Sequence, residues 1–196
     1  MNYLSHLYIA HLTQTDLAGA VAADFVRGPL TGWPEPLRTG MALHRLVDRQ
    51  MDSHPQVLSL KRQFNQRHRR MAGILLDMAF DHQLAKHWSH YHPTPLPQFA
   101  AHCYQTMTSS PVLPDSFRPV LIAMQQTDWL SQYQHRQGID RAIRGIAQRL
   151  SQPDRLLHAR DEIWRLNHEI YHAFTQVLPE LVTDCQHHLR QPPAQS

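Results

Sequence analysis

Two aspartates on one apolar helix face are the residues of this sequence best suited to do chemistry. Asp77 and Asp81 are spaced at three and four residues from Ile74, Leu84 and Trp88, and this spacing defines a single helix face. Two like charges one turn apart repel each other, and each loses hydration when it faces a core. The pattern predicts that one carboxylate is protonated or that a cation lies between them.

Ionisable side chains point inward in three further segments. Asp24 falls on the apolar stripe of a second predicted helix. His44 and Asp48 lie one turn apart on a third, and His6 lies on the apolar face of the first. Carboxylates and imidazoles that converge from separate helices are typical of a cation site in a helical bundle. The predicted metal ligands are Asp24, His44, Asp48, Asp77 and Asp81.

The predicted ligand set indicates which ion would bind and what it would do. Carboxylate oxygens with some imidazole and no thiolate suit Mn²⁺, Mg²⁺ or Fe²⁺ better than a structural zinc. Such ions activate water and polarise phosphoryl oxygens. Arg27 and Arg45 each lie close in sequence to a predicted ligand and could clamp an anionic phosphodiester. These residues favour a metal-dependent phosphodiester hydrolase.

A structural interpretation of the aspartates competes with the metal site. Asp77 and Asp81 could pair with arginines in an ion-pair network without binding any ion. The candidate partners are Arg27, Arg45 and Arg49. We favour the metal because burying several charges for stability alone seldom gains anything.

Other motifs also have a structural alternative. His6 and His82 could be hydrogen-bonded core histidines as readily as ligands or proton carriers. Asp52 fits a helix cap better than a ligand. The segment Glu169–His172 has the Glu-x-x-His spacing of di-iron bundles, but that architecture needs two copies and the sequence holds one.

Apolar spacing with a period of 3.6 residues continues through the chain, and no segment alternates with the period of a strand. The sequence therefore predicts an all-α fold. Asp16 is placed to cap a helix, and Pro55 suits a first turn. The expected helices are Tyr3–Leu12, Asp16–Val26, Met41–Met51, Pro55–Gln66, Arg70–Ser89, Pro97–Thr108, Ser116–Gln126, Asp140–Leu150, Leu156–Val177 and Pro179–Leu189.

Length and composition limit the class of protein. A chain of 196 residues predicts one compact domain over 1–190 with a frayed tail over 191–196. Two distant cysteines, Cys103 and Cys185, argue against a disulfide framework and for the cytoplasm. No apolar run approaches the roughly 20 residues of a membrane span. The net charge of +3 is weak for a nucleic-acid binder, so we expect neither membrane nor nucleic acid as a partner.

Four segments together resemble one known family. They are Asn2–Leu7, Ala23–Gly28, His44–Asp48 and Asp77–Trp88, and all lie before about residue 90. In this order they look like bacterial acyl carrier protein phosphodiesterase, whose resemblance extends over most of the chain. The family is regarded as an offshoot of the all-helical HD phosphohydrolases, so the resemblance implies a compact, multi-helix, HD-phosphohydrolase-like domain.

The resemblance also implies a reaction. The family uses Mn²⁺ or Mg²⁺ to hydrolyse the phosphodiester between 4'-phosphopantetheine and a serine of holo acyl carrier protein. We expect a metal-activated water, with Arg27 or Arg45 contacting the phosphoryl oxygens and His6 or His82 protonating the serine. The sequence departs from the HD pattern because it holds only the reversed pair Asp81-His82. Which predicted ligands touch the ion is therefore left open.

A basic run supplies a candidate docking strip for the acidic carrier protein. It consists of Lys61, Arg62, Arg67, Arg69 and Arg70, and complementary charge would speed the encounter between the two proteins. Two other functions stay open. One is an HD-like metal phosphohydrolase acting on nucleotides, and the other is a non-catalytic helical metal-binding protein.

Overall fold

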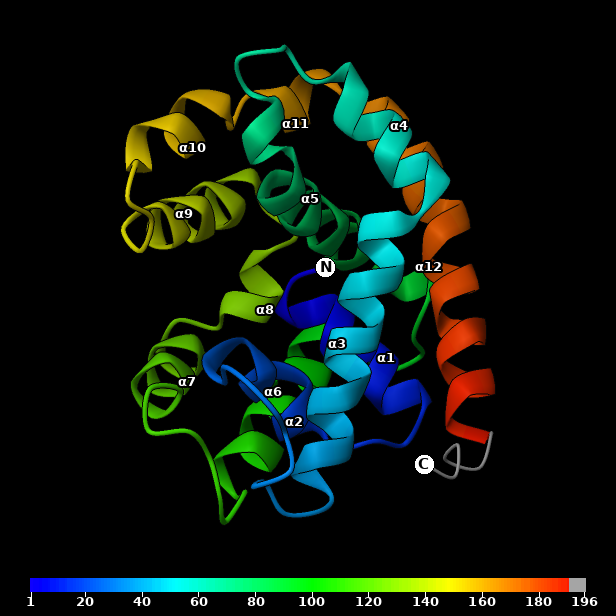
Figure 1. Ribbon diagram of the computed structural model, residues 1–196, viewed down its shortest axis with the longest axis vertical. Coiled ribbons are helices and arrows are strands. Elements are labelled where there is room, and N and C mark those ends of the chain that lie inside the picture. Colours follow the sequence, from blue (N-terminus) through cyan, green and yellow to red (C-terminus); the bar gives the residue numbers. More distant parts are fainter. Residues whose placement is uncertain (191–196) are drawn as a thin grey trace.

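The computed structural model describes residues 1–190, and every regular element in that range is helical (Figure 1). This confirms the all-α fold, whereas the HD-like architecture stays a prediction. The tail predicted for residues 191–196 lies outside the described residues. The α-helices are α1 Tyr3–Leu12, α2 Leu17–Ala22, α3 Leu37–Ser53, α4 Pro55–Gln63, α5 Ala72–Lys86, α6 Leu96–Thr108, α7 Arg118–Gln126, α8 Trp129–Gln132, α9 Arg136–Ala147, α10 Pro153–Ala159, α11 Glu162–Arg165 and α12 Asn167–Arg190. Three short 3₁₀ helices are η1 Ala23–Phe25, η2 Arg69–Met71 and η3 Trp88–His90.

Helices α3 and α5 organise the centre of the molecule. Helix α3, cyan in Figure 1, packs against α1, α2, α4 and α12. Helix α5 packs against α1, α9 and α12, while α6 contacts α7 and α8. Buried apolar side chains from all these helices form one continuous cluster. Met1 and Asn2, just before α1, line one cavity together with residues of α3, α5 and α9.

Two glycines allow a close contact between α2 and α3. Gly19 of α2 faces Gly40 of α3, and a Cβ atom on either residue would lie 3.0 Å from the Cα atom of the other. The added Cβ would also overlap the carbonyl oxygen of Leu37 or of Asp16. Only glycine lets the two backbones approach this closely. This contact fixes η1 against the middle of α3.

The predicted helix starts in the N-terminal half are mostly correct. The Asp16 carboxylate accepts from the backbone N–H of Gly19 at 2.6 Å, which confirms the predicted cap. Pro55 is confirmed in the first turn of α4. The predicted start at Met41 is wrong, because α3 begins at Leu37 and Glu35 accepts from the backbone N–H of Thr39 at 3.2 Å.

The C-terminal helices differ most from the prediction. The single helix predicted over 156–177 is interrupted twice, after α10 and after α11. The first interruption places Glu162 at the start of α11, where its carboxylate accepts from the backbone N–H of Asn65 in the loop after α4. Pro179 was predicted to begin a new helix but lies inside α12. A proline removes one hydrogen bond there, and packing of α12 against α3, α4 and α5 holds the helix together. The short helix α8 was not predicted.

Two further sequence predictions concern the thiols and the membrane. Cys103 and Cys185 are buried free thiols, as expected for a chain without a disulfide framework. Within residues 1–190, no helix combines the length and the apolar character that crossing a bilayer requires.

Candidate metal centre

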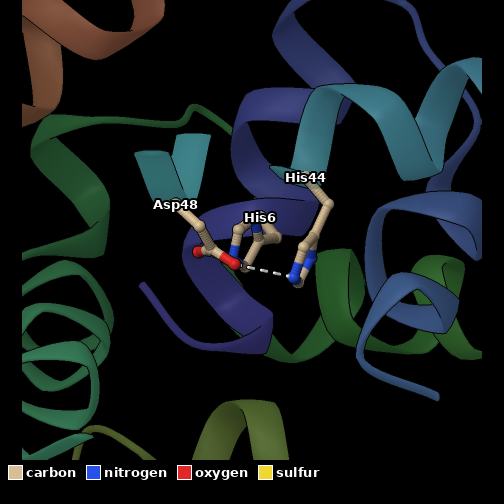
Figure 2. Close-up of side chains that lie close together, drawn as sticks. All are labelled: His6, His44 and Asp48. Carbon is tan, nitrogen blue, oxygen red and sulfur yellow. Dashed lines mark ion pairs between the residues drawn. The ribbon is translucent and has the colours of Figure 1, made fainter. Parts of the chain in front are cut away.

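Helices α1 and α3 bring two imidazoles and one carboxylate into contact (Figure 2). The ring of His6 stacks on the ring of His44 with a centroid separation of 3.8 Å. Asp48 lies one turn after His44 on α3; its Oδ1 is 3.2 Å from Nε2 of His6, and its Oδ2 is 3.0 Å from Nε2 of His44. One donor atom from each residue lies within 4.8 Å of the other two. This geometry suits a shared cation.

A cavity with a volume of about 200 Å³ lies beside the cluster, and it is lined by Asp48 and by three further aspartates, Asp24, Asp52 and Asp77. Asp24 of η1 places Oδ1 3.2 Å from Nε2 of His44. Asp77 of α5 accepts from the N-terminal ammonium of Met1 at 2.8 Å, and that ammonium lies 3.6 Å from Asp48. The side chains of Asp24, Asp48 and Asp77 are 45%, 43% and 38% exposed. The carboxylates therefore face an open cavity and not the closed core that the sequence suggested.

His44 cannot satisfy its surroundings as a neutral imidazole. Its Nδ1 lies 2.7 Å from the carbonyl oxygen of Ala20 and must donate there, because that oxygen only accepts. In the neutral ring Nε2 then carries a lone pair that faces the carboxylates of Asp24 and Asp48. Burial lowers the pKa of His44, but hydrogen bonds and charge from these carboxylates outweigh it and raise the pKa to about 9. The site needs a positive charge, either a proton or a metal ion.

The other two members of the cluster have the charge states that a metal requires. Burial and the neighbouring His44 lower the pKa of His6 to about 4, so its imidazole is neutral at neutral pH. Burial raises the pKa of Asp48, but hydrogen bonds from His44 and His6 outweigh this and hold it well below the usual range. Neutral imidazole and ionised carboxylate are the forms that bind metals. Nε2 of His6 faces two acceptors, the carbonyl oxygen of Met1 at 3.1 Å and Asp48, so it carries the ring proton. That proton must move to Nδ1 before Nε2 can bind an ion.

The donor set therefore fits a divalent ion. His6, His44 and Asp48 supply two nitrogens and a carboxylate, and Asp24 can add a further oxygen. Nδ1 of His6 is buried without a hydrogen-bond partner among the described residues. No thiolate belongs to this cluster, and the preference for Mn²⁺, Mg²⁺ or Fe²⁺ stays a prediction.

Asp81 is not placed with the other predicted ligands. It is fully buried, and it accepts from the backbone N–H groups of Leu4 and Ser5 and from the Ser5 hydroxyl, at 2.8, 3.0 and 2.5 Å. Burial raises the pKa of Asp81 to about 6 despite these donors. The predicted cation between Asp77 and Asp81 is therefore not supported, because Asp81 anchors the start of α1 and Asp77 pairs with Met1.

None of the four predicted catalytic side chains lines the cavity. His6 belongs to the cluster beside it, and the other three lie further away. Nδ1 of His82 lies 2.8 Å from the carbonyl oxygen of Tyr133, and its ring meets Trp164 edge to face. His82 is thus a hydrogen-bonded core histidine, the structural alternative considered above. Arg45 donates to the carbonyl oxygen of Val26 at 3.2 Å, and Arg27 is exposed.

Sequence reasoning missed parts of the cavity wall. Asp52 lines the cavity and pairs with Lys61 at 2.8 Å, so it is neither the predicted cap nor a free ligand. Asn2 and Ile146 also line it. Ile146 belongs to α9, in the half of the sequence without a transferable motif. Its periodic spacing marks it as a core residue and cannot show which cavity it borders.

The fold and the cluster together define an all-helical protein with a candidate divalent-metal centre. The model of the family described as acyl carrier protein phosphodiesterase matches residues 1–181. The chain belongs to this family, which confirms the resemblance found in the sequence.

Curated relatives agree along nearly the whole chain. Acyl carrier protein phosphodiesterase of Shigella boydii serotype 18 is 34% identical over 95% of this chain and 98% of its own. The proteins of the same name from Enterobacter sp. strain 638 and Serratia proteamaculans are 32% and 34% identical, covering 95% and 93% of this chain and 98% and 96% of their own. No solved structure gives a significant match.

Proposed function

We propose that the protein hydrolyses the phosphodiester joining 4'-phosphopantetheine to a serine of holo acyl carrier protein. The products are apo carrier protein and 4'-phosphopantetheine. Membership of a family described as acyl carrier protein phosphodiesterase supports the reaction and the substrate. The observation that carries the proposal is the convergence of His6, His44 and Asp48 beside an open cavity.

We further propose that this cluster holds Mn²⁺, with Mg²⁺ or Fe²⁺ as substitutes. His6, His44 and Asp48 are the direct ligands, and Asp24 completes the set. A bound divalent ion supplies activation of water and polarisation of the phosphoryl oxygens. Asp77 lies across the cavity, and its charge is balanced by the Met1 ammonium.

Other residues position this set and control charge and protons. Nδ1 of His44 donates to Ala20 and so aims Nε2 at Asp24 and Asp48. Arg45 ties Val26 to α3 and thereby holds the segment that carries Asp24 and Arg27, and Arg27 remains our candidate for contact with the phosphate. His6 is neutral at neutral pH and therefore suits a ligand better than an acid. We propose that water, which reaches the half-exposed carboxylates, protonates the departing serine.

The basic strip offers a surface for the carrier protein. Arg62, Arg67, Arg69 and Arg70 are exposed from the end of α4 to η2, and Lys61 is half-buried against Asp52. An acidic partner would meet complementary charge here, which raises the rate of encounter more than the affinity.

Mass spectrometry of holo carrier protein tests the proposed reaction. We expect loss of the prosthetic arm when the protein and Mn²⁺ are present, and no loss after removal of metal by a chelator. Asp48→Asn serves as the control for contaminating hydrolases. Turnover of a nucleotide panel with intact holo carrier protein would instead assign the site to nucleotides. Binding of Mn²⁺ without turnover of either substrate would indicate a non-catalytic metal-binding protein.

A further inference from the structure

A second cavity opens beside the candidate metal centre. It has a volume of about 290 Å³ and lies between the first residues of α1 and the helices α8 and α9. Asn2 and Ile146 line both this cavity and the acidic one. The two cavities are therefore neighbours, with Asn2 and Ile146 between them.

The second cavity combines apolar surface with amide groups. Trp129 and Tyr133 supply aromatic surface, while Gln132 and Gln148 supply side-chain amides that both donate and accept. Asn2 adds a third amide where the cavities meet. Pockets for small molecules have this mixture of apolar walls and a few polar groups, with volumes of roughly 300 to 1,000 Å³. A cavity at the lower end of that range suits a narrow chain.

The charge of the second cavity is opposite to that of the first. Arg141, Arg144 and Arg149 belong to its lining, which includes no aspartate or glutamate among the described residues. Tyr3 lies at the boundary: burial raises its pKa to about 12, the charge of Asp24 adds to the rise, and Arg149 opposes it. An anionic group between the two cavities would thus meet the acidic centre on one side and guanidinium groups on the other.

We infer that the second cavity binds the pantetheine arm of the substrate. The inference rests on the proposed function, because it takes the phosphodiester to lie at His6, His44 and Asp48. Pantetheine is a narrow chain with a branched dimethyl group, two amides and a terminal thiol. Its dimethyl group suits the aromatic wall, and its amides can pair with Gln132 and Gln148. The arm then continues directly from the phosphate into the neighbouring cavity.

Binding of the arm would also contribute to the rate. Interactions with parts of the substrate that do not react can position the reacting group. Binding of the arm between α8 and α9 would hold the phosphodiester at the metal centre, because the arm is attached to the phosphate on the side away from the carrier serine. If a bulky side chain filled the second cavity of the enzyme, the carrier protein would still dock, but its phosphodiester would react slowly.

Gly145 provides a direct test, because it lines the cavity and a Cβ atom there meets no heavy atom within 4 Å. Gly145→Phe fills the cavity without a backbone clash. Gly138 is unsuitable, since a Cβ there would overlap the carbonyl oxygen of Gln132. Gln137→Phe is the matched control, because it adds the same ring at an exposed position of α9 outside the lining. Gln148→Ala is a second variant that adds no bulk.

Calorimetry with free pantetheine, which has no phosphodiester, measures arm binding without turnover. We expect the wild type and Gln137→Phe to bind pantetheine equally, and Gly145→Phe and Gln148→Ala to bind at least about 10-fold more weakly, the effect of losing about 1.4 kcal/mol. The kcat/KM for holo carrier protein should fall by a similar factor in the same two variants. Circular dichroism melting checks that the variants fold.

The outcomes separate the inference from the proposed function. If the wild type cleaves holo carrier protein but does not bind pantetheine, or if Gly145→Phe and Gln148→Ala both bind it normally, the assignment of this cavity is overturned. If pantetheine binds and Gly145→Phe abolishes binding while holo carrier protein stays intact, the assignment is supported and the proposed hydrolysis fails.

Discussion

Asp48 is the residue on which the candidate metal centre depends most. Its two carboxylate oxygens approach His6, His44 and the Met1 ammonium, so a single side chain links α1 to α3. We predict that Asp48→Asn, which keeps the size of the side chain, lowers both Mn²⁺ affinity and turnover by at least about 100-fold. Substitution of a residue that only supports a metal ligand already lowers metal affinity or activity by roughly 10- to 100-fold, and a direct ligand should matter at least as much. Calorimetric titration with Mn²⁺ and the carrier-protein assay measure the two effects. Unchanged metal affinity would remove Asp48 from the ligand set.

Asp81 should behave differently, although the sequence placed it beside Asp77. Its carboxylate accepts three hydrogen bonds at the start of α1, and an asparagine would turn an N–H group toward at least one of those donors. We predict that Asp81→Asn lowers the free energy of unfolding by about 2 kcal/mol and leaves the Mn²⁺ affinity of the folded protein unchanged. Urea unfolding and Mn²⁺ titration decide between anchor and ligand. A loss of Mn²⁺ affinity at full stability would restore Asp81 as a ligand.

The two carboxylates also show the limit of reasoning from residue spacing. The period of 3.6 residues predicted that Asp24, His44, Asp48 and Asp77 lie on the inner faces of their helices. In the structure Asp24, Asp48 and Asp77 line one cavity, and His44 contacts Asp24 and Asp48. Spacing says nothing of partners from distant parts of the chain. Asp81 meets Leu4 and Ser5, which lie 77 and 76 residues away.

At the scale of helices, the α2–α3 contact positions the metal centre. We predict that Gly40→Ala destabilises the protein by about 2 kcal/mol, the usual effect of forcing an extra group into a packed contact, because the new methyl group would overlap Asp16. Moving α2 away from α3 also moves Ala20, the acceptor of His44, so turnover should fall. Gly73→Ala, with no heavy atom within 4 Å of its Cβ, is the matched control. Equal melting temperatures for the two variants would contradict the role of the contact.

Glu162, in the interrupted region between α10 and α12, should make the stability of the protein depend on pH. The Glu162 side chain is 5% exposed and accepts from Asn65, His68 and Arg165. Burial raises its pKa, but these donors outweigh burial and lower it to about 2, from 4.5. The stability from Glu162 is therefore fully present above about pH 4.5 and is lost as the pH falls toward 2.

We predict that Glu162→Gln is less stable than the wild type at pH 7 and that the difference shrinks between pH 4.5 and pH 3. Urea unfolding at these three pH values measures it, and comparison of the two proteins cancels the contribution of other acidic groups. A difference that does not change with pH would show that the charge of Glu162 has no role. Sequence periodicity could not find this break, because the helix is interrupted by contacts with Asn65 and His68.

Across the whole molecule, helices with strong local signals were predicted well. The start of α4 has a proline in its first turn and that of α2 has an aspartate cap, and both begin within one residue of the prediction. The helices whose bounds were predicted wrongly depend on packing between distant segments. Helix α12, for example, continues through Pro179 because it packs against α3, α4 and α5. The wall formed by α9 could not be predicted, since no residue pattern indicates which helix closes a cavity.

The docking strip gives a prediction for the complete protein and its substrate. We predict that Arg62→Glu together with Arg70→Glu raises KM for holo carrier protein by about 10-fold at low salt and leaves kcat unchanged. The difference should diminish above about 0.5 M salt, where exposed charges are screened. Arg118→Glu is the control, because Arg118 is exposed on α7, far from α4 in Figure 1. An unchanged KM would place carrier docking on another surface.

The donors of the metal centre and the walls of the neighbouring cavity come from different stretches of the chain. His6, Asp24, His44, Asp48 and Asp77 all precede the segment 129–149, which supplies most of the second cavity. Substitutions that accumulate in 129–149 can therefore alter which molecules are accepted while the ion-binding residues stay intact. Among diverging relatives, we expect selectivity to evolve faster than the reaction itself.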